Sequence, residues 1–181
     1  MQYKIGYGLI LNDDMFNLIR DYELDVLQKI GVHQGLRQPP HITIKRPFLI
    51  DAGDLEKYID ILKHFASTSS PMDMSYGPIK WFGNETAYLS IQSEAIVNAH
   101  NHLLSLLAPQ GISIGDFESS SFIPHATLAL EYTPDQTSIV REIIDSRTLL
   151  SGASQIDSVG LFLSLDDRHW VIVAIQKFHS H

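Results

Sequence analysis

Two short stretches of the chain share a pattern that could do chemistry. One begins at residue 39 and reads PPHITIK, and the other begins at residue 123 and reads IPHATLA. Each places a threonine two residues after a histidine, within residues typical of a β-strand. Residues i and i+2 of a strand project from the same face. We therefore expect His41 and Thr43 to point to one side together, and His125 and Thr127 likewise.

Two histidines that face each other across a cleft suit the hydrolysis of a phosphodiester. One neutral imidazole takes a proton from the attacking water, and one protonated imidazole gives a proton to the departing oxygen. Hydroxyl groups beside them can stabilise the charge that builds up on the non-bridging phosphate oxygens. This chemistry needs no cofactor and no metal. The sequence leaves open whether His41 or His125 is the acid.

The surrounding sequence alternates between strand and helix patterns. Period-2 alternation predicts strands, and apolar residues at i, i+3, i+4 predict amphipathic helices. Asn12, Gly31 and a capping box at Thr133 mark helix ends. The expected order is strand 3–11, helix 13–30, strand 40–45, helix 55–62, two strands around a turn at 83–84, helix 97–107, a loop at 109–122, strand 122–130, helix 137–144, and strands 159–165 and 170–178.

Several residues recur at an offset of 84, and they include both histidines and both threonines of the motifs. A single pair of copies predicts two lobes packed as one domain. We expect an α+β fold over residues 1–181 with an internal duplication, around 39–93 and 123–177. Two mainly antiparallel sheets should line a central cleft, related by a pseudo-twofold axis, with helices packed outside.

Candidate substrate-binding residues lie just beyond the two motifs. Lys45 should share the face of His41 and could anchor a phosphate, although a solvated lysine at a strand end is an equal alternative. Among aromatic residues near the strand ends, Phe48 and Tyr132 are the favoured platforms for stacking on a base. Both could instead be ordinary core or rim residues.

Composition excludes several classes of function. The chain has no cysteine, so disulfides, thiolate catalysis and cysteine-based metal sites are excluded. Its 13 basic and 21 acidic residues give a net charge of −8, which argues against a protein that coats long nucleic acids. No apolar run approaches a membrane span. We expect a cytoplasmic monomer that binds a small nucleotide or an RNA end and has no membrane partner.

Other signals of chemistry are weaker. The sequence GISIG at 111–115 fits a serine-nucleophile pattern, but Ser113 lacks the strand before and the helix after that such an elbow requires. His100 and His102 lie two apart on a predicted helix and should face nearly opposite sides, so they should not share a metal. Gly6 and Gly8 in the first strand indicate a close backbone approach near the cleft.

The paired motifs resemble those of the two-histidine (2H) phosphoesterases, which include bacterial 2′-5′ RNA ligase-like proteins. The resemblance covers essentially the whole chain. It implies metal-independent chemistry on a cyclic nucleotide phosphate or a 2′-5′ phosphodiester, with His41, Thr43, His125 and Thr127 as catalytic residues. A catalytically silent module that binds nucleotides or RNA ends is the alternative within the same fold.

Overall fold

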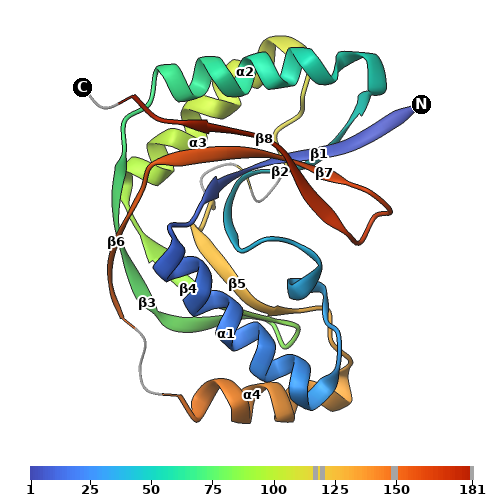
Figure 1. Cartoon of the computed structure of the whole chain (residues 1–181), viewed down its shortest axis with the longest axis vertical. Helices are drawn as coiled ribbons and strands as arrows, with labels where there is room; N and C mark the ends of the chain where they lie inside the picture. The colour runs from blue at the N-terminus through green and yellow to red at the C-terminus, as the bar shows by residue number, and fades with distance from the viewer. Residues whose placement is uncertain (116–117, 119–120, 148–150, 180–181) are drawn as a thin grey trace.

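A computed structural model describes residues 1–115, 118, 121–147 and 151–179 (Figure 1). Part of the loop expected at 109–122 therefore lies outside the described residues. The described helices and strands, in chain order, are β1 Gln2–Ile10, α1 Asp13–Ile30, β2 His41–Asp51, α2 Leu55–Ser67, β3 Met72–Phe82, β4 Thr86–Gln92, α3 Glu94–Leu107, β5 His125–Leu130, α4 Thr137–Asp145, β6 Gly152–Ile156, β7 Ser158–Ser164 and β8 Trp170–Lys177.

Local signals in the sequence set the ends of the helices. The side chain of Asn12 accepts a hydrogen bond from the backbone N–H of Met15 at 3.0 Å, which caps the first turn of α1. Gly31 ends α1 with φ of 82°, a left-handed conformation that glycine adopts without strain. Thr133 and Gln136 form the expected capping box before α4. The predicted helix boundaries are confirmed at these positions.

The described strands join one antiparallel sheet in the order β6-β3-β4-β5-β2-β1-β7-β8. The α+β class and the antiparallel pairing are confirmed, and the two expected sheets are the two halves of one curled sheet. The two four-stranded halves of the single sheet meet where Ile42 of β2 pairs with Ala126 of β5. The two strands that carry the motifs are thus the central pair of one curled sheet.

The helices cover one face of each half of this sheet. In Figure 1, α2 and α3 lie with β8, β7 and β1 in the upper half, and α1 and α4 lie below, with β5 and β4. Residues on the helix-facing side of the central strands, including Ile42, Ile44, Ala126 and Leu128, are completely buried. Burial of this apolar face holds β2 and β5 in register, because a slip of one residue would turn every side chain to the other face.

The internal duplication around 39–93 and 123–177 stays a prediction. Strand β4 lies beside the motif strand β5, whereas β8 lies at a free edge of the sheet. Ile91 and Ile175, which also match at the offset of 84, therefore occupy different places in the two halves. By position in the sheet, the counterpart of β4 is β1, because each is the outer neighbour of a motif strand.

Within the described ranges, no helix has the length and apolar character to cross a membrane.

Candidate active site

The pairing of β2 with β5 brings the two motifs together. Ile42 lies opposite Ala126, and the antiparallel register continued by one residue places His41 opposite Thr127 and Thr43 opposite His125. Opposed residues of antiparallel strands have Cα atoms about 4.5–5.5 Å apart. Since Ile42 and Ala126 point into the core, the histidines and threonines share the opposite, open face of the sheet. The structure thus gathers the four side chains as the motif spacing predicts.

Backbone carbonyl groups fix the orientation of both imidazole rings. His41 Nδ1 lies 2.8 Å from the carbonyl oxygen of Pro39, and His125 Nδ1 lies 2.8 Å from that of Ile123. A carbonyl only accepts, so each Nδ1 carries the hydrogen and each neutral ring keeps its lone pair on Nε2. Nε2 of His41 lies 3.0 Å from the hydroxyl oxygen of Thr43. In each ring, Nε2 is therefore the nitrogen that can take up a proton.

Burial lowers the pKa of both motif histidines and so favours their neutral forms. Loss of solvent around His41, against the opposing effect of the Pro39 carbonyl and with a smaller contribution from the neighbouring His125, lowers the pKa of His41 to about 4. Burial also lowers the pKa of His125, and the Ile123 carbonyl opposes the shift. A bound phosphate anion would favour the protonated form of either ring.

His41 lies between a glycine and an aromatic ring. Its ring centroid lies 4.4 Å from that of Phe162 on β7. Gly8 of β1 pairs with Thr43, and a Cβ atom there would lie 2.8 Å from His41 Cδ2 and 2.9 Å from Phe162 Cε2. The close backbone approach that the sequence predicts in the first strand is therefore present at Gly8, whose backbone lies against the His41 ring. Only a residue without a side chain lets the imidazole lie in this position.

His125 has a different neighbourhood. Tyr88 pairs with Thr127, the place that corresponds to Gly8 beside Thr43. The His125 ring meets the edges of Phe82 and Tyr88 at centroid distances of 5.0 and 5.3 Å, and these two rings stack on each other at 4.0 Å. Tyr88 is buried, but Phe82 is 37% exposed and offers an aromatic surface next to the site. No pattern in the sequence pointed to Phe162, which lies about 120 residues from His41.

The expectation for Lys45 is corrected. Thr43 pairs with Gly8 but Lys45 pairs with Tyr7, so one extra residue bulges β2 between them and turns Lys45 away from the motif face. Lys45 is 3% exposed, and its ammonium lies 2.6 Å from the carboxylate of Glu118 and 3.4 Å from the carbonyl oxygen of Ser113. A buried and paired ammonium cannot serve as the phosphate anchor on the face of His41.

The two favoured aromatic platforms also belong to the interior. The ring of Phe48 packs at 6.4 Å from Tyr7 and 5.5 Å from Tyr58. Tyr132 is 8% exposed, and its hydroxyl donates to the carbonyl oxygen of Asn84 at 2.8 Å. Neither ring is placed to stack on a base beside the histidines. Tyr132 is a core residue and Phe48 is a partly buried residue that packs against the core, which is the alternative that the sequence left open.

The weaker signals stay outside the site. His100 is buried in α3, with its ring nitrogens 2.7 and 2.9 Å from the carbonyl oxygens of Ile44 and Glu118, while the ring of His102 packs on Phe65. The two histidines thus do not share a ligand position. Ser113 lies in a described stretch, 112–115, without helix or strand, so the strand–turn–helix context of a nucleophile elbow is missing there.

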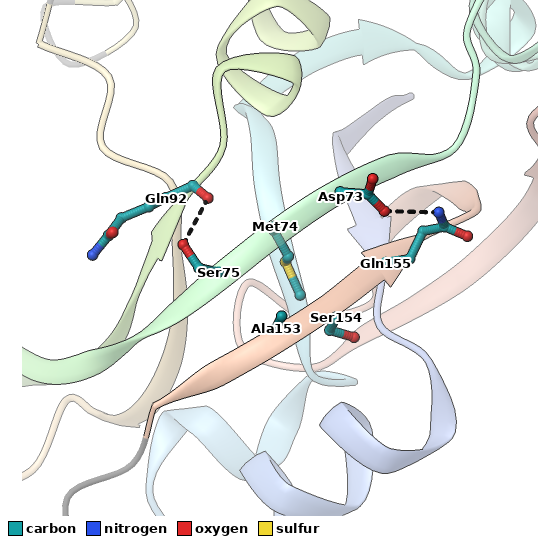
Figure 2. A pocket seen from close by; sticks show the side chains of 7 residues that line it. All are labelled: Asp73, Met74, Ser75, Gln92, Ala153, Ser154 and Gln155. Atoms are coloured by element: carbon teal, nitrogen blue, oxygen red, sulfur yellow. Dashed lines mark hydrogen bonds between the residues drawn. The ribbon is translucent and has the colours of Figure 1, made fainter.

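A groove of about 650 Å³ lies on the open face of the same half-sheet as His125 (Figure 2). Ser90 pairs with His125, Gln92 lies two residues further along β4 on the same face, and Ser75 of β3 pairs with Gln92. Figure 2 shows Asp73 hydrogen-bonded to Gln155 of β6 across this groove, at 2.8 Å. Its polar groups are amide, hydroxyl and carboxylate, which suit an uncharged polar ligand better than an anion.

Comparison with known proteins gives the class of this fold. The Thermus thermophilus protein TT0787 superposes with a TM-score of 0.69, at 13% identity over 97% of both chains. E. coli LigT in complex with 3′-AMP superposes with a TM-score of 0.67, at 12% identity over 99% of this chain and 100% of LigT. These superpositions establish a shared LigT-like α+β fold.

Sequence comparison places the chain within a family. A Bacillus pumilus protein, provisionally named a phosphoesterase, is 22% identical over 74% of this chain and 76% of its own length. A similarly named Bacillus licheniformis protein is 23% identical over 74% and 77%. The pattern of the 2′-5′ RNA ligase superfamily matches residues 17–168. The chain belongs to the 2′-5′ RNA ligase superfamily, the group of two-histidine phosphoesterases that its motifs resemble.

Proposed function

We propose that this protein is a metal-independent phosphoesterase that opens a cyclic nucleotide phosphate, 2′,3′-cyclic or related, or cleaves a 2′-5′ phosphodiester. One observation carries the proposal: paired central strands present His41, Thr43, His125 and Thr127 on one open face. Two imidazoles and two hydroxyls are the groups that acid–base cleavage of a phosphodiester requires. Membership of the 2′-5′ RNA ligase superfamily supports the same reaction class.

The proposed reaction begins with both imidazoles neutral. The phosphate anion of the substrate binds between them and raises the pKa of one ring, which takes up a proton. The other ring accepts a proton at Nε2 from the attacking water, while the protonated ring donates to the departing ribose oxygen. The hydroxyls of Thr43 and Thr127 donate to the non-bridging oxygens as negative charge builds up there. The direction in which the substrate lies decides which histidine takes each role.

A small substrate fits the surroundings of the site. The net charge of −8 disfavours a long nucleic acid lying across the surface, whereas a nucleotide or an RNA end needs only local donors. The exposed ring of Phe82 offers a stacking surface beside His125. LigT, which shares the fold, has been crystallised with 3′-AMP. A nucleotide of that size is the substrate class we propose here.

The test is hydrolysis of a panel of 2′,3′-cyclic nucleotides, ADP-ribose 1″,2″-cyclic phosphate and 2′-5′ oligonucleotides. His41→Ala and His125→Ala should each lower kcat by roughly 10²–10⁴. His64→Ala, a change at an exposed histidine on α2, is the matched control and should keep full activity. EDTA should leave the rate unchanged. Full activity in either motif variant would exclude the two-histidine mechanism, and nucleotide binding without turnover would identify a binding module.

A further inference from the structure

A second hollow, of about 200 Å³, lies where three distant segments of the chain meet. It is lined by residues of the turn and 3₁₀ helix before β2, by the residue after β5, and by the turn between β7 and β8. These are Val32, His33, Gln34, Arg37, Glu131 and Arg168. The amide of Gln34 donates to the carbonyl oxygen of Arg168 at 2.5 Å and ties two of the segments together. Two arginines from opposite parts of the sequence thereby line one small space.

This hollow lies next to the candidate active site. Arg37 precedes His41 by four residues, and Glu131 follows Thr127 by four, while His41 and Thr127 face each other across the central strands. Four residues of chain span at most about 14 Å. Figure 1 shows the β7–β8 hairpin reaching from the upper half toward the segment that joins α1 to β2. The hollow is therefore close to the end of the strand pair where His41 and Thr127 lie.

The charges around the hollow are not balanced by the protein itself. Arg20 and Arg147 form ion pairs with Glu23 and Asp25. In contrast, no ion pair within the described part of the chain engages Arg37, Arg168 or Glu131.

Arg37 also has a buried Nε without a hydrogen-bond partner in that part of the chain. Among the residues that line the hollow, two guanidinium groups accompany one carboxylate, so the lining is net positive in a protein whose total charge is −8. An anion in the hollow would be attracted by both guanidinium groups. Their planar donor sets match the oxygens of a phosphate group.

We infer that this hollow binds a second phosphate group of the substrate, such as a 5′-phosphate or a pyrophosphate on the nucleotide cleaved between His41 and His125. The inference rests on the proposed function for the group that is cleaved, and it adds a determinant of specificity. The carboxylate of Glu131 limits the excess positive charge to about one, so the hollow favours one phosphate group over an extended polyanion. A ribose hydroxyl can donate to that carboxylate.

The test compares adenosine 2′,3′-cyclic phosphate with its 5′-phosphorylated form. Wild type should cleave the 5′-phosphorylated substrate with a kcat/KM about tenfold higher, because one charge-assisted hydrogen bond is enough for that difference. In Arg168→Gln, and in Arg37→Gln, the ratio of the two kcat/KM values should fall close to one. Arg141→Gln, which changes an arginine on α4 outside the hollow, is the matched control and should keep the wild-type ratio. A ratio near one in wild type, or one unchanged in Arg168→Gln, would overturn the inference.

A binding measurement separates this inference from the proposed function. If no variant and no wild-type sample cleaves either substrate, the proposed function fails, and calorimetric titration with 5′-AMP then tests the hollow alone. Tighter binding of 5′-AMP than of adenosine by wild type, lost in Arg168→Gln, would support the phosphate subsite. Equal affinity for 5′-AMP and adenosine in wild type would overturn it. Because Arg168 is exposed in a turn, its replacement should leave the fold intact.

Discussion

Gly8 offers a direct way to move His41, which we propose to be catalytic, without replacing it. A Cβ atom at this position would lie 2.8 Å from His41 Cδ2, where ordinary contact begins at 3.4 Å. In Gly8→Ala the imidazole must therefore move by about 0.6 Å, away from its place against Phe162. Catalytic groups need placement within about 0.5 Å, and an error of 1 Å can cost 10²-fold in rate. We expect kcat to fall by about 10- to 100-fold.

The assay is steady-state cleavage of a 2′,3′-cyclic nucleotide, with thermal unfolding followed by circular dichroism on the same samples. Gly53→Ala is the matched control, because a Cβ atom at Gly53 has no neighbour within 4 Å and the residue has no positive φ. Gly53→Ala should keep both the rate and the unfolding temperature. Gly8→Ala should stay folded at the assay temperature but lose rate. Wild-type kcat in folded Gly8→Ala would refute the argument that glycine positions the His41 ring.

Two further predictions concern charge. Because burial lowers the pKa of His41 to about 4, kcat/KM should not fall as the pH drops from 6.5 toward 4 if His41 is the base, and an acid limb near pH 6.5 would contradict this. Between pH 6.5 and 4 the unfolded chain then binds more protons than the folded one, because only the unfolded His41 takes up a proton there. His41 should therefore lower the free energy of unfolding by about 3 kcal/mol as the pH falls over that range. In denaturant titrations, His41→Ala should lose correspondingly less free energy of unfolding over the same range. Glu118→Gln, which leaves the ammonium of Lys45 buried without its partner at 2.6 Å, should lower the free energy of unfolding by about 3–5 kcal/mol. Urea unfolding measures the change, and a loss below 1 kcal/mol would show that this pair is not an important buried contact.

Local patterns predicted most of the secondary structure because their causes are local. Asn12, Gly31 and Thr133 end or begin helices through bonds to residues within a few positions, so their effect can be read from the sequence. Strand β6 was missed because Gly152–Ile156 contains glycine and serine and little apolar alternation. It forms a strand because Met72–Tyr76 of β3 pairs with it, a contact across 80 residues that no local pattern carries.

The placement of the motif residues was predictable and the surroundings of Lys45 and His41 were not, for a related reason. His41 and Thr43 lie on one face because the strand is regular between them. Between Thr43 and Lys45 the strand has a bulge. A bulge interrupts the alternation of side chains between the two faces, on which the expectation for Lys45 depended. Phe162 reaches His41 through two intervening strand pairings, β2 with β1 and β1 with β7. Such a contact follows from sheet order, which the sequence alone did not provide.

The paired strands make the two histidines equivalent, and their neighbours make them different. The place beside Thr43 is held by Gly8, which lets His41 pack against Phe162, whereas the place beside Thr127 is held by Tyr88, which stacks with an exposed Phe82 next to His125. These unequal surroundings would let an asymmetric nucleotide, the substrate class that we propose, bind in one direction in a nearly symmetric site. In the proposed reaction, that direction decides which histidine acts as the acid, because the motif residues themselves give no preference.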